Sequence, residues 1–162
     1  MKEELTKLLD ECIEKGNEAD LSVIKQMLEG VRRKQDNQNG SYIGAVLAMD
    51  KTSGDNTCKV TIPITPLTFN SLGIVHGGIT ATLVDTAMGT LANILLPEGY
   101  GAVTTNLTIH YLAPGQHGSL TATGTLVHKG SKTLVIDGKV LSEEGKTIAH
   151  CTGSFFIVKK KI

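Results

Sequence analysis

The sequence predicts an α+β fold in which one antiparallel sheet wraps around a single long helix, preceded by a helical extension. Three observations predict it: apolar residues recur at helical spacing near the N-terminus, strand-like alternation begins after Ser41, and one strong helical segment follows around residues 77–95. A chain of 162 residues suffices for a buried core without disulfides or metals. We therefore expect a helical extension over residues 1–40 and a main domain over residues 41–162.

The helical extension is expected to contain two amphipathic helices joined around Gly16 and Asn17. Asp20 is a candidate N-cap for the second helix. The apolar positions at helical spacing are Leu5, Leu8, Leu9, Cys12 and Ile13 in the first helix, and Leu21, Ile24, Leu28 and Val31 in the second. The polar run over residues 32–40 is interpreted as a linker.

The main domain is expected to follow the order strand, strand, long helix and then four strands. Cys58, Val60 and Ile62 alternate with polar residues, as in a half-buried strand. The helix is predicted to begin near Gly77 and to end before Pro97. Further strands are predicted over residues 102–113, 119–128, 133–142 and 147–158. Because the connections between these strands are short, the sheet is expected to be antiparallel.

Composition excludes several classes of function. Sixteen basic and sixteen acidic side chains cancel, and aromatic residues make up 4%, which argues against binding to nucleic acid or to an anionic membrane. Three widely spaced cysteines, Cys12, Cys58 and Cys151, are typical of free thiols in a reducing compartment. With no secretory signal pattern, a cytoplasmic protein without a metal site or separate cofactor is expected.

Asp85 is the one formally charged residue between Lys59 and Glu98, so this segment is expected to be largely buried. A helical projection places Asp85 opposite the apolar face, on a side rich in small residues. The predicted apolar face contains Ile79, Leu83, Ala87, Thr90, Leu91 and Ile94, and the predicted small-residue side contains Gly78, Ala81, Gly89 and Ala92. A partly desolvated carboxylate is suited to act as a general base. The alternative is that Asp85 lies on an ordinary solvent-facing stripe.

The helix entry is a second candidate site. Gly77 and Gly78 leave the first helical N–H groups unobstructed, so that they could stabilise a developing oxyanion, although a structural turn also explains two glycines after His76. Eight residues of helix rise about 12 Å, so Gly77 and Asp85 of one helix cannot contact the same reacting carbon. Two copies related by a two-fold axis would solve this, which predicts a homodimer with shared sites.

These residues resemble a known family. The pattern Asn70-x5-His76-Gly77-Gly78, followed by Asp85 and by the segment from Val103 to Pro114, resembles the hotdog-fold acyl-CoA thioesterases of the 4HBT superfamily, and most closely their PaaI-like branch. The resemblance covers about residues 42–158 and implies the fold described above, with the long helix enclosed by the sheet. The chain lacks the early-strand Asp motif of the 4-hydroxybenzoyl-CoA branch and the Asp and His dyad of hotdog hydratases.

The resemblance also implies roles for single residues. Asp85 would be the general base or nucleophile, Gly77 would donate its N–H to the thioester oxygen, and Thr104 would help to position water. Asn70 would orient water or the substrate carbonyl, with His76 supporting the loop. Asn70 and Gly77 would come from one subunit of a homodimer, or of a tetramer built as a dimer of dimers, and Asp85 and Thr104 from its partner. The expected reaction is hydrolysis of an aliphatic or aromatic acyl-CoA.

Substrate-binding candidates are less sharply defined. Coenzyme A enters as part of the substrate, and its phosphates require basic or N–H donors. The segment His128-Lys129-Gly130-Ser131-Lys132 is a candidate, although a solvated hairpin turn explains it equally well. Gly78 and Met88 are further candidates, Met88 either lining an acyl channel or packing in the core. The competing function is a non-catalytic acyl-CoA-binding hotdog module, which would not need to keep Asp85, Asn70 and Thr104 together.

Overall fold

A computed structural model describes residues 1–160. The chain forms two compact units: residues 1–49 with 65–68, and residues 50–64 with the chain from Phe69 onward. The first unit therefore extends past the expected boundary at residue 40 and includes a short 3₁₀ helix, Pro66–Thr68, supplied by a later part of the chain. Each unit is described by itself below.

The first unit is helical, with α1 at Lys2–Lys15, α2 at Glu18–Gln35 and α3 at Tyr42–Val46. The predicted cap at Asp20 is wrong. Asn17 is the N-cap, and Asp20 completes a capping box by accepting from the Asn17 N–H at 3.0 Å. The predicted linker is also too long, because the helical hydrogen bonding of α2 continues through Gln35. α3 replaces the strand-like pattern expected after Ser41, since five residues are too few to establish a period.

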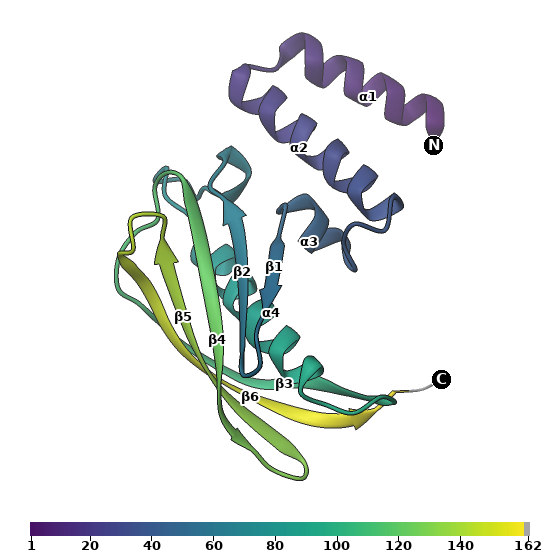
Figure 1. The fold of residues 1–162 in the computed structure, drawn as a ribbon. Coiled ribbons are helices and arrows are strands. Elements are labelled where there is room, and N and C mark those ends of the chain that lie inside the picture. Colours follow the sequence, from purple (N-terminus) through teal and green to yellow (C-terminus); the bar gives the residue numbers. More distant parts are fainter. Residues whose placement is uncertain (161–162) are drawn as a thin grey trace. The chain divides into compact units, whose positions relative to one another are not determined.

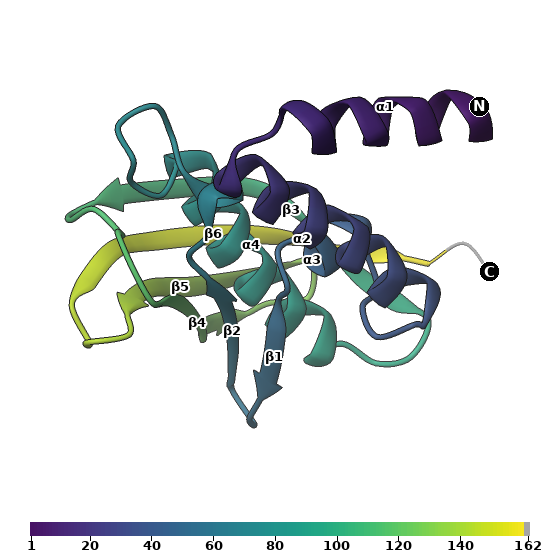
Figure 2. The ribbon, with the colours of Figure 1, turned by 90° about the horizontal axis from the view of Figure 1, so that it is seen from above.

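The second unit is a six-stranded antiparallel sheet curled around one helix, as the sequence predicts (Figure 1). The helix, α4, runs from Gly77 to Ile94, and the sheet order is β1-β2-β4-β5-β6-β3. The strand bounds are β1 Asp50–Ser53, β2 Thr57–Pro63, β3 Tyr100–Tyr111, β4 Ser119–Lys129, β5 Thr133–Ser142 and β6 Thr147–Lys159. Figure 2 shows α4 lying across one face of this sheet.

The core lies between α4 and the sheet, and three glycines allow their close approach. A Cβ atom at Gly138 would lie 2.7 Å from Val84 Cγ2 and 2.9 Å from Met88 Sδ. Cβ atoms at Gly124 and Gly153 would lie 3.0 Å and 3.1 Å from atoms of Met88. These glycines come from β4, β5 and β6, and Gly124 pairs directly with Gly138. The helix can therefore pack directly on the sheet backbone at Met88.

The buried face of α4 differs from the helical projection. Its buried residues are Thr80, Leu83, Val84, Ala87, Met88, Leu91 and Ala92. Ile94, which was predicted on the apolar face, is 51% exposed, whereas Ala92, which was predicted beside Asp85, is fully buried. The projection fails here because the sheet curves around the helix, and because the glycines of the sheet bring its closest contact with α4 to Met88. A helical projection of the sequence contains neither the curvature nor this contact.

Strand β3 lies at the edge of the sheet and pairs only with β6. Its twelve residues include no Lys, Arg, Asp, Glu or Pro. Two apolar side chains on or beside it, Val103 and Leu112, are 48% and 60% exposed. The loop before α4 also departs from the expected burial, since Leu72 is 80% exposed. Among residues 1–160, no helix is both long and apolar enough to cross a membrane.

Candidate active site

Asp85 lies about midway along α4 and borders a shallow hollow of about 480 Å³. Thr86, Gly89, Thr90, Asn93 and Ile94 form the rest of the lining. The carboxylate is half-buried, and its Oδ1 atom accepts a hydrogen bond from Thr104 Oγ1 at 2.9 Å. No other side chain or backbone group among residues 1–160 bonds to it. The second carboxylate oxygen therefore remains able to accept a proton or a water molecule.

Thr104 reaches Asp85 from β3, at a point where the strand is irregular. The register of β3 against β6 shifts between Thr104 and Asn106, which is the mark of a β-bulge. Bulges change the direction of neighbouring side chains, and this one lies directly beside the residue that bonds Asp85. Two sequence-predicted site residues, 19 positions apart in the chain, are thus in direct contact.

The first turn of α4 presents one unpartnered backbone donor. Gly78 N–H donates to His76 Nδ1 at 2.8 Å, and the N–H groups of Ile79 and Thr80 both donate to the His76 carbonyl. Gly77 N–H has no acceptor among residues 1–160. Because helix N-termini carry a partial positive charge, this N–H is suited to bind a carbonyl oxygen that gains negative charge.

Asn70 holds the loop that leads into α4. Its Oδ1 atom accepts from the N–H groups of Leu72 at 2.8 Å and Ile74 at 3.4 Å. The loop turns at Gly73, whose φ of +70° lies in the left-handed region that favours glycine. The Asn70 side-chain NH₂ has no acceptor among the described residues. Asn70 can thus shape the loop with its oxygen and donate to a ligand with its nitrogen.

A second hollow, of about 430 Å³, adjoins the entry of α4. Its lining includes Asn70, Gly77, Tyr111, Leu112, Pro114 and Ile148. Tyr111 was not singled out as a site residue from the sequence, yet its hydroxyl donates to the Gly77 carbonyl at 2.9 Å. The available signal was its place in the motif before Leu112 and Pro114, at the end of a predicted strand.

The site residues fall into two groups at separate points along α4. Asp85 and Thr104 form one group, and Asn70, His76 and Gly77 form the other. α4 is helical throughout from Gly77 to Ile94, so the rise from Gly77 to Asp85 is about 12 Å. The two groups of one chain are therefore too far apart to contact the same reacting carbon.

Of the other predicted binding residues, Gly78 lies at the helix entry beside Gly77, and the rest line neither hollow. Met88 is fully buried among core glycines and lines neither hollow, which corresponds to its core interpretation. His128 and Lys129 end β4, and residues 130–132 form the turn that follows. Lys129 Nζ donates to the carbonyl of Leu95, the C-cap of α4, at 2.6 Å. This ammonium therefore complements the negative end of the helix dipole.

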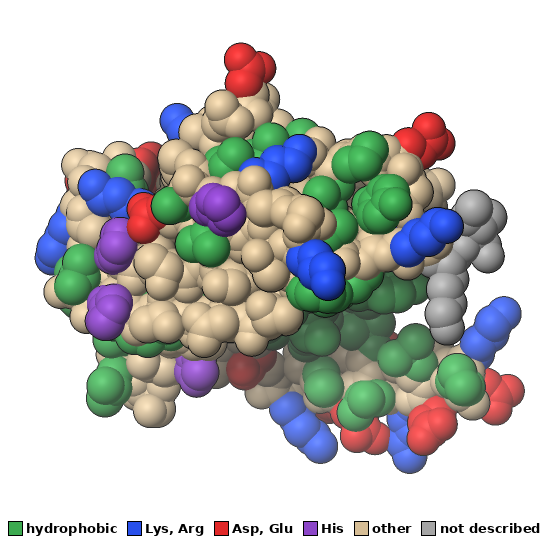
Figure 3. Space-filling view, turned by 90° about the horizontal axis from the view of Figure 1, so that it is seen from below, with side chains coloured by type: hydrophobic (Ala, Val, Ile, Leu, Met, Phe, Trp, Pro, Cys, Tyr) green, Lys and Arg blue, Asp and Glu red, His purple; other side chains and the backbone are tan. Residues whose placement is uncertain are grey.

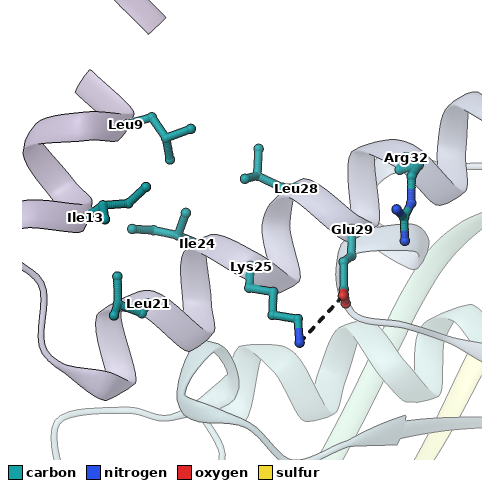
Figure 4. A pocket seen from close by; sticks show the side chains of 8 residues that line it. All are labelled: Leu9, Ile13, Leu21, Ile24, Lys25, Leu28, Glu29 and Arg32. Atoms are coloured by element: carbon teal, nitrogen blue, oxygen red, sulfur yellow. Dashed lines mark ion pairs between the residues drawn. The ribbon is translucent and has the colours of Figure 1, made fainter. Parts of the chain in front are cut away.

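The first unit has an apolar groove that was not predicted (Figure 4). It lies between α1 and α2 and is rimmed by Lys25, Glu29 and Arg32, with Lys25 and Glu29 4.0 Å apart. Its apolar lining consists of Leu9, Ile13, Leu21, Ile24 and Leu28. The helical spacing of these residues was visible in the sequence, but the gap between the helices was not. Within residues 1–160, no three His, Cys, Asp or Glu side chains cluster closely enough to hold a metal ion.

Comparisons with known proteins place the chain in a family. Residues 72–149 match the thioesterase superfamily model. The acyl-coenzyme A thioesterase PaaI of Escherichia coli is 36% identical over 109 residues, which cover 67% of this chain and 73% of PaaI. A relative from Saccharolobus solfataricus is 32% identical over 90 residues, which cover 56% of this chain. The match spans 64% of the relative's own length, slightly under two thirds. The BH2602 protein of Bacillus halodurans, solved with CoA, has a TM-score of 0.88 and 38% identity, covering 94% of this chain and 99% of BH2602.

Proposed function

The chain belongs to the thioesterase superfamily of thioester hydrolases, as a PaaI-like member with the hotdog fold, and we propose on this premise that it hydrolyses an acyl-CoA to a free acid and CoA. The observation that carries the proposal is the hydrogen bond from Thr104 to Asp85, beside an open hollow on α4. This bond holds a half-buried carboxylate in place and leaves its second oxygen available for a water molecule.

In the proposed reaction, Asp85 acts as general base. It takes a proton from water, whose oxygen then forms a bond to the thioester carbon. Gly77 N–H binds the resulting oxyanion, and the Asn70 NH₂ group orients the carbonyl. Collapse of the tetrahedral intermediate breaks the C–S bond and releases CoA as thiolate, which takes up a proton from Asp85 or from solvent. Because thiolate is a fair leaving group, the route needs no Ser-His-Asp triad. Coenzyme A takes part only as a portion of the substrate, and the route uses no separate cofactor.

Water attack and attack by Asp85 itself leave different isotope patterns. A single turnover in ¹⁸O-labelled water places the label in the free acid if Asp85 is the base. If Asp85 is the nucleophile, it forms a mixed anhydride with the acyl group as CoA thiolate leaves. Water attack on the Asp85 carbon of this anhydride then breaks its bond to the bridging oxygen, so that the free acid carries an Asp85 oxygen and the label appears in Asp85. Label found in Asp85 therefore identifies the nucleophilic route.

The two residue groups support a homodimer with composite sites. They are about 12 Å apart along one helix, so the Gly77 end of one copy must meet Asp85 of another to enclose one thioester. The uncharged edge of β3 and the exposed apolar side chains of Leu72, Val103 and Leu112 support a contact of this kind. Figure 3 shows one face of the molecule with a broad central area of uncharged polar side chains and backbone, on which hydrophobic, Lys or Arg, and His side chains are scattered. A tetramer would consist of two such dimers.

The CoA phosphates are proposed to bind at the turn after β4. Lys132 and Ser131 are exposed there, whereas Lys129 is already bonded to the Leu95 carbonyl. Lys132 is therefore the principal cation proposed for the phosphates. All three cysteines are free, which supports a reducing compartment such as the cytoplasm as the place of action.

Thiol release from a panel of aliphatic and aromatic acyl-CoAs tests the activity. We expect Asp85→Asn to lower kcat by about 10²- to 10⁴-fold, the range for loss of a general base. Asp55→Asn is the matched control, because Asp55 is an exposed aspartate in the turn between β1 and β2, and it should leave kcat unchanged. If the wild type binds acyl-CoA but releases no thiol, the protein is instead the non-catalytic binding module.

Mixed dimers test whether the sites are composite. Asp85→Asn and Asn70→Ala chains should each be nearly inactive alone. In a mixed dimer, one site combines both intact groups and the other combines both defects. Random pairing after co-expression should therefore restore about a quarter of the wild-type rate. Sites contained within one chain would give no restoration, and a mass measurement in solution would separate dimer from tetramer.

A further inference from the structure

Tyr111 connects the end of an edge strand to the entry of α4. It is the last residue of β3 and pairs with Ala149 of β6. Its hydroxyl donates to the Gly77 carbonyl at 2.9 Å. Its ring also lies close to Gly77, since a Cβ atom there would be 3.3 Å from Tyr111 Cζ and Oη. The same two residues line the hollow at the helix entry.

The peptide group between Gly77 and Gly78 is held at both ends. Tyr111 binds its carbonyl, and His76 Nδ1 binds its N–H at 2.8 Å. A glycine pair has more backbone freedom than any other pair, so the first turn of α4 gains from restraint by side chains. The two side chains supply the restraint that the missing Cβ atoms do not. The neighbouring Gly77 N–H is left without an acceptor among residues 1–160.

We propose that Tyr111 is a positioning residue for thioester cleavage. By holding the Gly77 carbonyl, its hydroxyl fixes the orientation of the helix entry and of the adjacent Gly77 N–H beside the hollow. This inference rests on the proposed function and adds to it a residue that does not itself touch the reacting atoms. Partial burial, with a smaller contribution from negative charge on Cys151, raises the pKa of Tyr111, which favours the protonated hydroxyl that donates this bond.

The variant Tyr111→Phe removes the hydroxyl and keeps the ring against Gly77. Loss of one hydrogen bond that orients an oxyanion donor should lower kcat about five- to tenfold, and KM should rise by no more than the roughly fivefold expected for binding of the carbonyl. Tyr100→Phe is the matched control, because Tyr100 begins the same strand and its hydroxyl makes no hydrogen bond within residues 1–160. It should retain the wild-type kcat.

Two unreactive acyl-CoA analogues separate positioning from a general structural role. One analogue keeps the carbonyl but replaces the thioester sulfur by methylene, and the other keeps the sulfur but replaces the carbonyl by methylene. Tyr111→Phe should weaken binding of the first about fivefold and leave binding of the second unchanged. Equal weakening of both analogues, or a fall in kcat matched by a loss of folded protein, would overturn the inference.

The outcomes also separate this inference from the proposed function. An active wild type with an equally active Tyr111→Phe variant would overturn the role of Tyr111 alone. A wild type that releases thiol from no acyl-CoA would overturn both.

Discussion

At the scale of single residues, Thr104 is the closest support of Asp85. Thr104→Ala removes the one hydrogen bond to the carboxylate seen in residues 1–160. We expect kcat for thiol release to fall about tenfold, because the carboxylate loses its fixed orientation. Thr104→Ser keeps the hydroxyl and should retain most of the activity. A Ser variant as slow as the Ala variant would show that the methyl group matters rather than the bond.

The three cysteines should differ sharply in reactivity. Cys12 is exposed, whereas Cys58 and Cys151 are buried. Burial, together with the charge of Asp137, raises the pKa of Cys151 from 9.0 to about 11. An aromatic disulfide reagent at pH 8 should therefore modify one thiol rapidly in the folded protein and three in denaturant. The Cys12→Ser variant should show no rapid phase, and a persistent rapid phase would contradict the burial of the other two.

The same shift predicts a direction for stability in alkali. The folded pKa of Cys151 lies above the unfolded value of 9.0, so the folded state disfavours the thiolate. Its contribution to stability is fully present below pH 9.0 and is lost as the pH rises toward 11. Urea unfolding at pH 8 and pH 10 should show a smaller loss of stability for Cys151→Ala than for the wild type.

At the scale of elements, the contact between α4 and the sheet depends on Gly138. Its substitution by alanine would place a methyl group 2.7 Å from Val84 Cγ2, closer than carbon atoms normally approach. We expect Gly138→Ala to destabilise the protein by about 1–3 kcal/mol, as measured by urea unfolding. Gly40→Ala is the control, since nothing lies within 4 Å of its added Cβ atom. Equal free energies of unfolding for both variants would mean that α4 can move away from the added methyl group without loss of stability.

The elements show where sequence reasoning succeeds and where it stops. Long periodic segments were predicted to within two residues, as for α4, expected near 77–95 and found at Gly77–Ile94. The five-residue helix α3 was missed because it is shorter than two helical turns. The burial of Ala92 was missed because it depends on how the sheet curves around α4. The family resemblance placed Thr104 and Asp85 on the same subunit, whereas the hydrogen bonds from Thr104 to Asp85 and from Tyr111 to Gly77 needed the three-dimensional structure.

At the scale of the whole molecule, α1 is the least integrated element. None of its residues is buried, and Leu5 and Leu8 are more than half exposed. Removal of residues 1–16 should therefore change the midpoint of thermal unfolding by less than about 2 °C, because little apolar area becomes exposed. Differential scanning calorimetry measures this directly. A fall of more than about 5 °C would show that α1 is covered in the assembled protein.

The strand order also determines when the sheet can form during synthesis. β6 pairs with both β3 and β5, and β2 pairs with β4 across the whole of α4 and β3 in sequence. Pairings between distant segments slow folding, so refolding on a scale of about milliseconds to seconds is expected. On the ribosome, β3 emerges well before its partner and must wait with both edges open until β6 follows. Chaperone binding to this uncharged strand would protect the nascent chain during that interval.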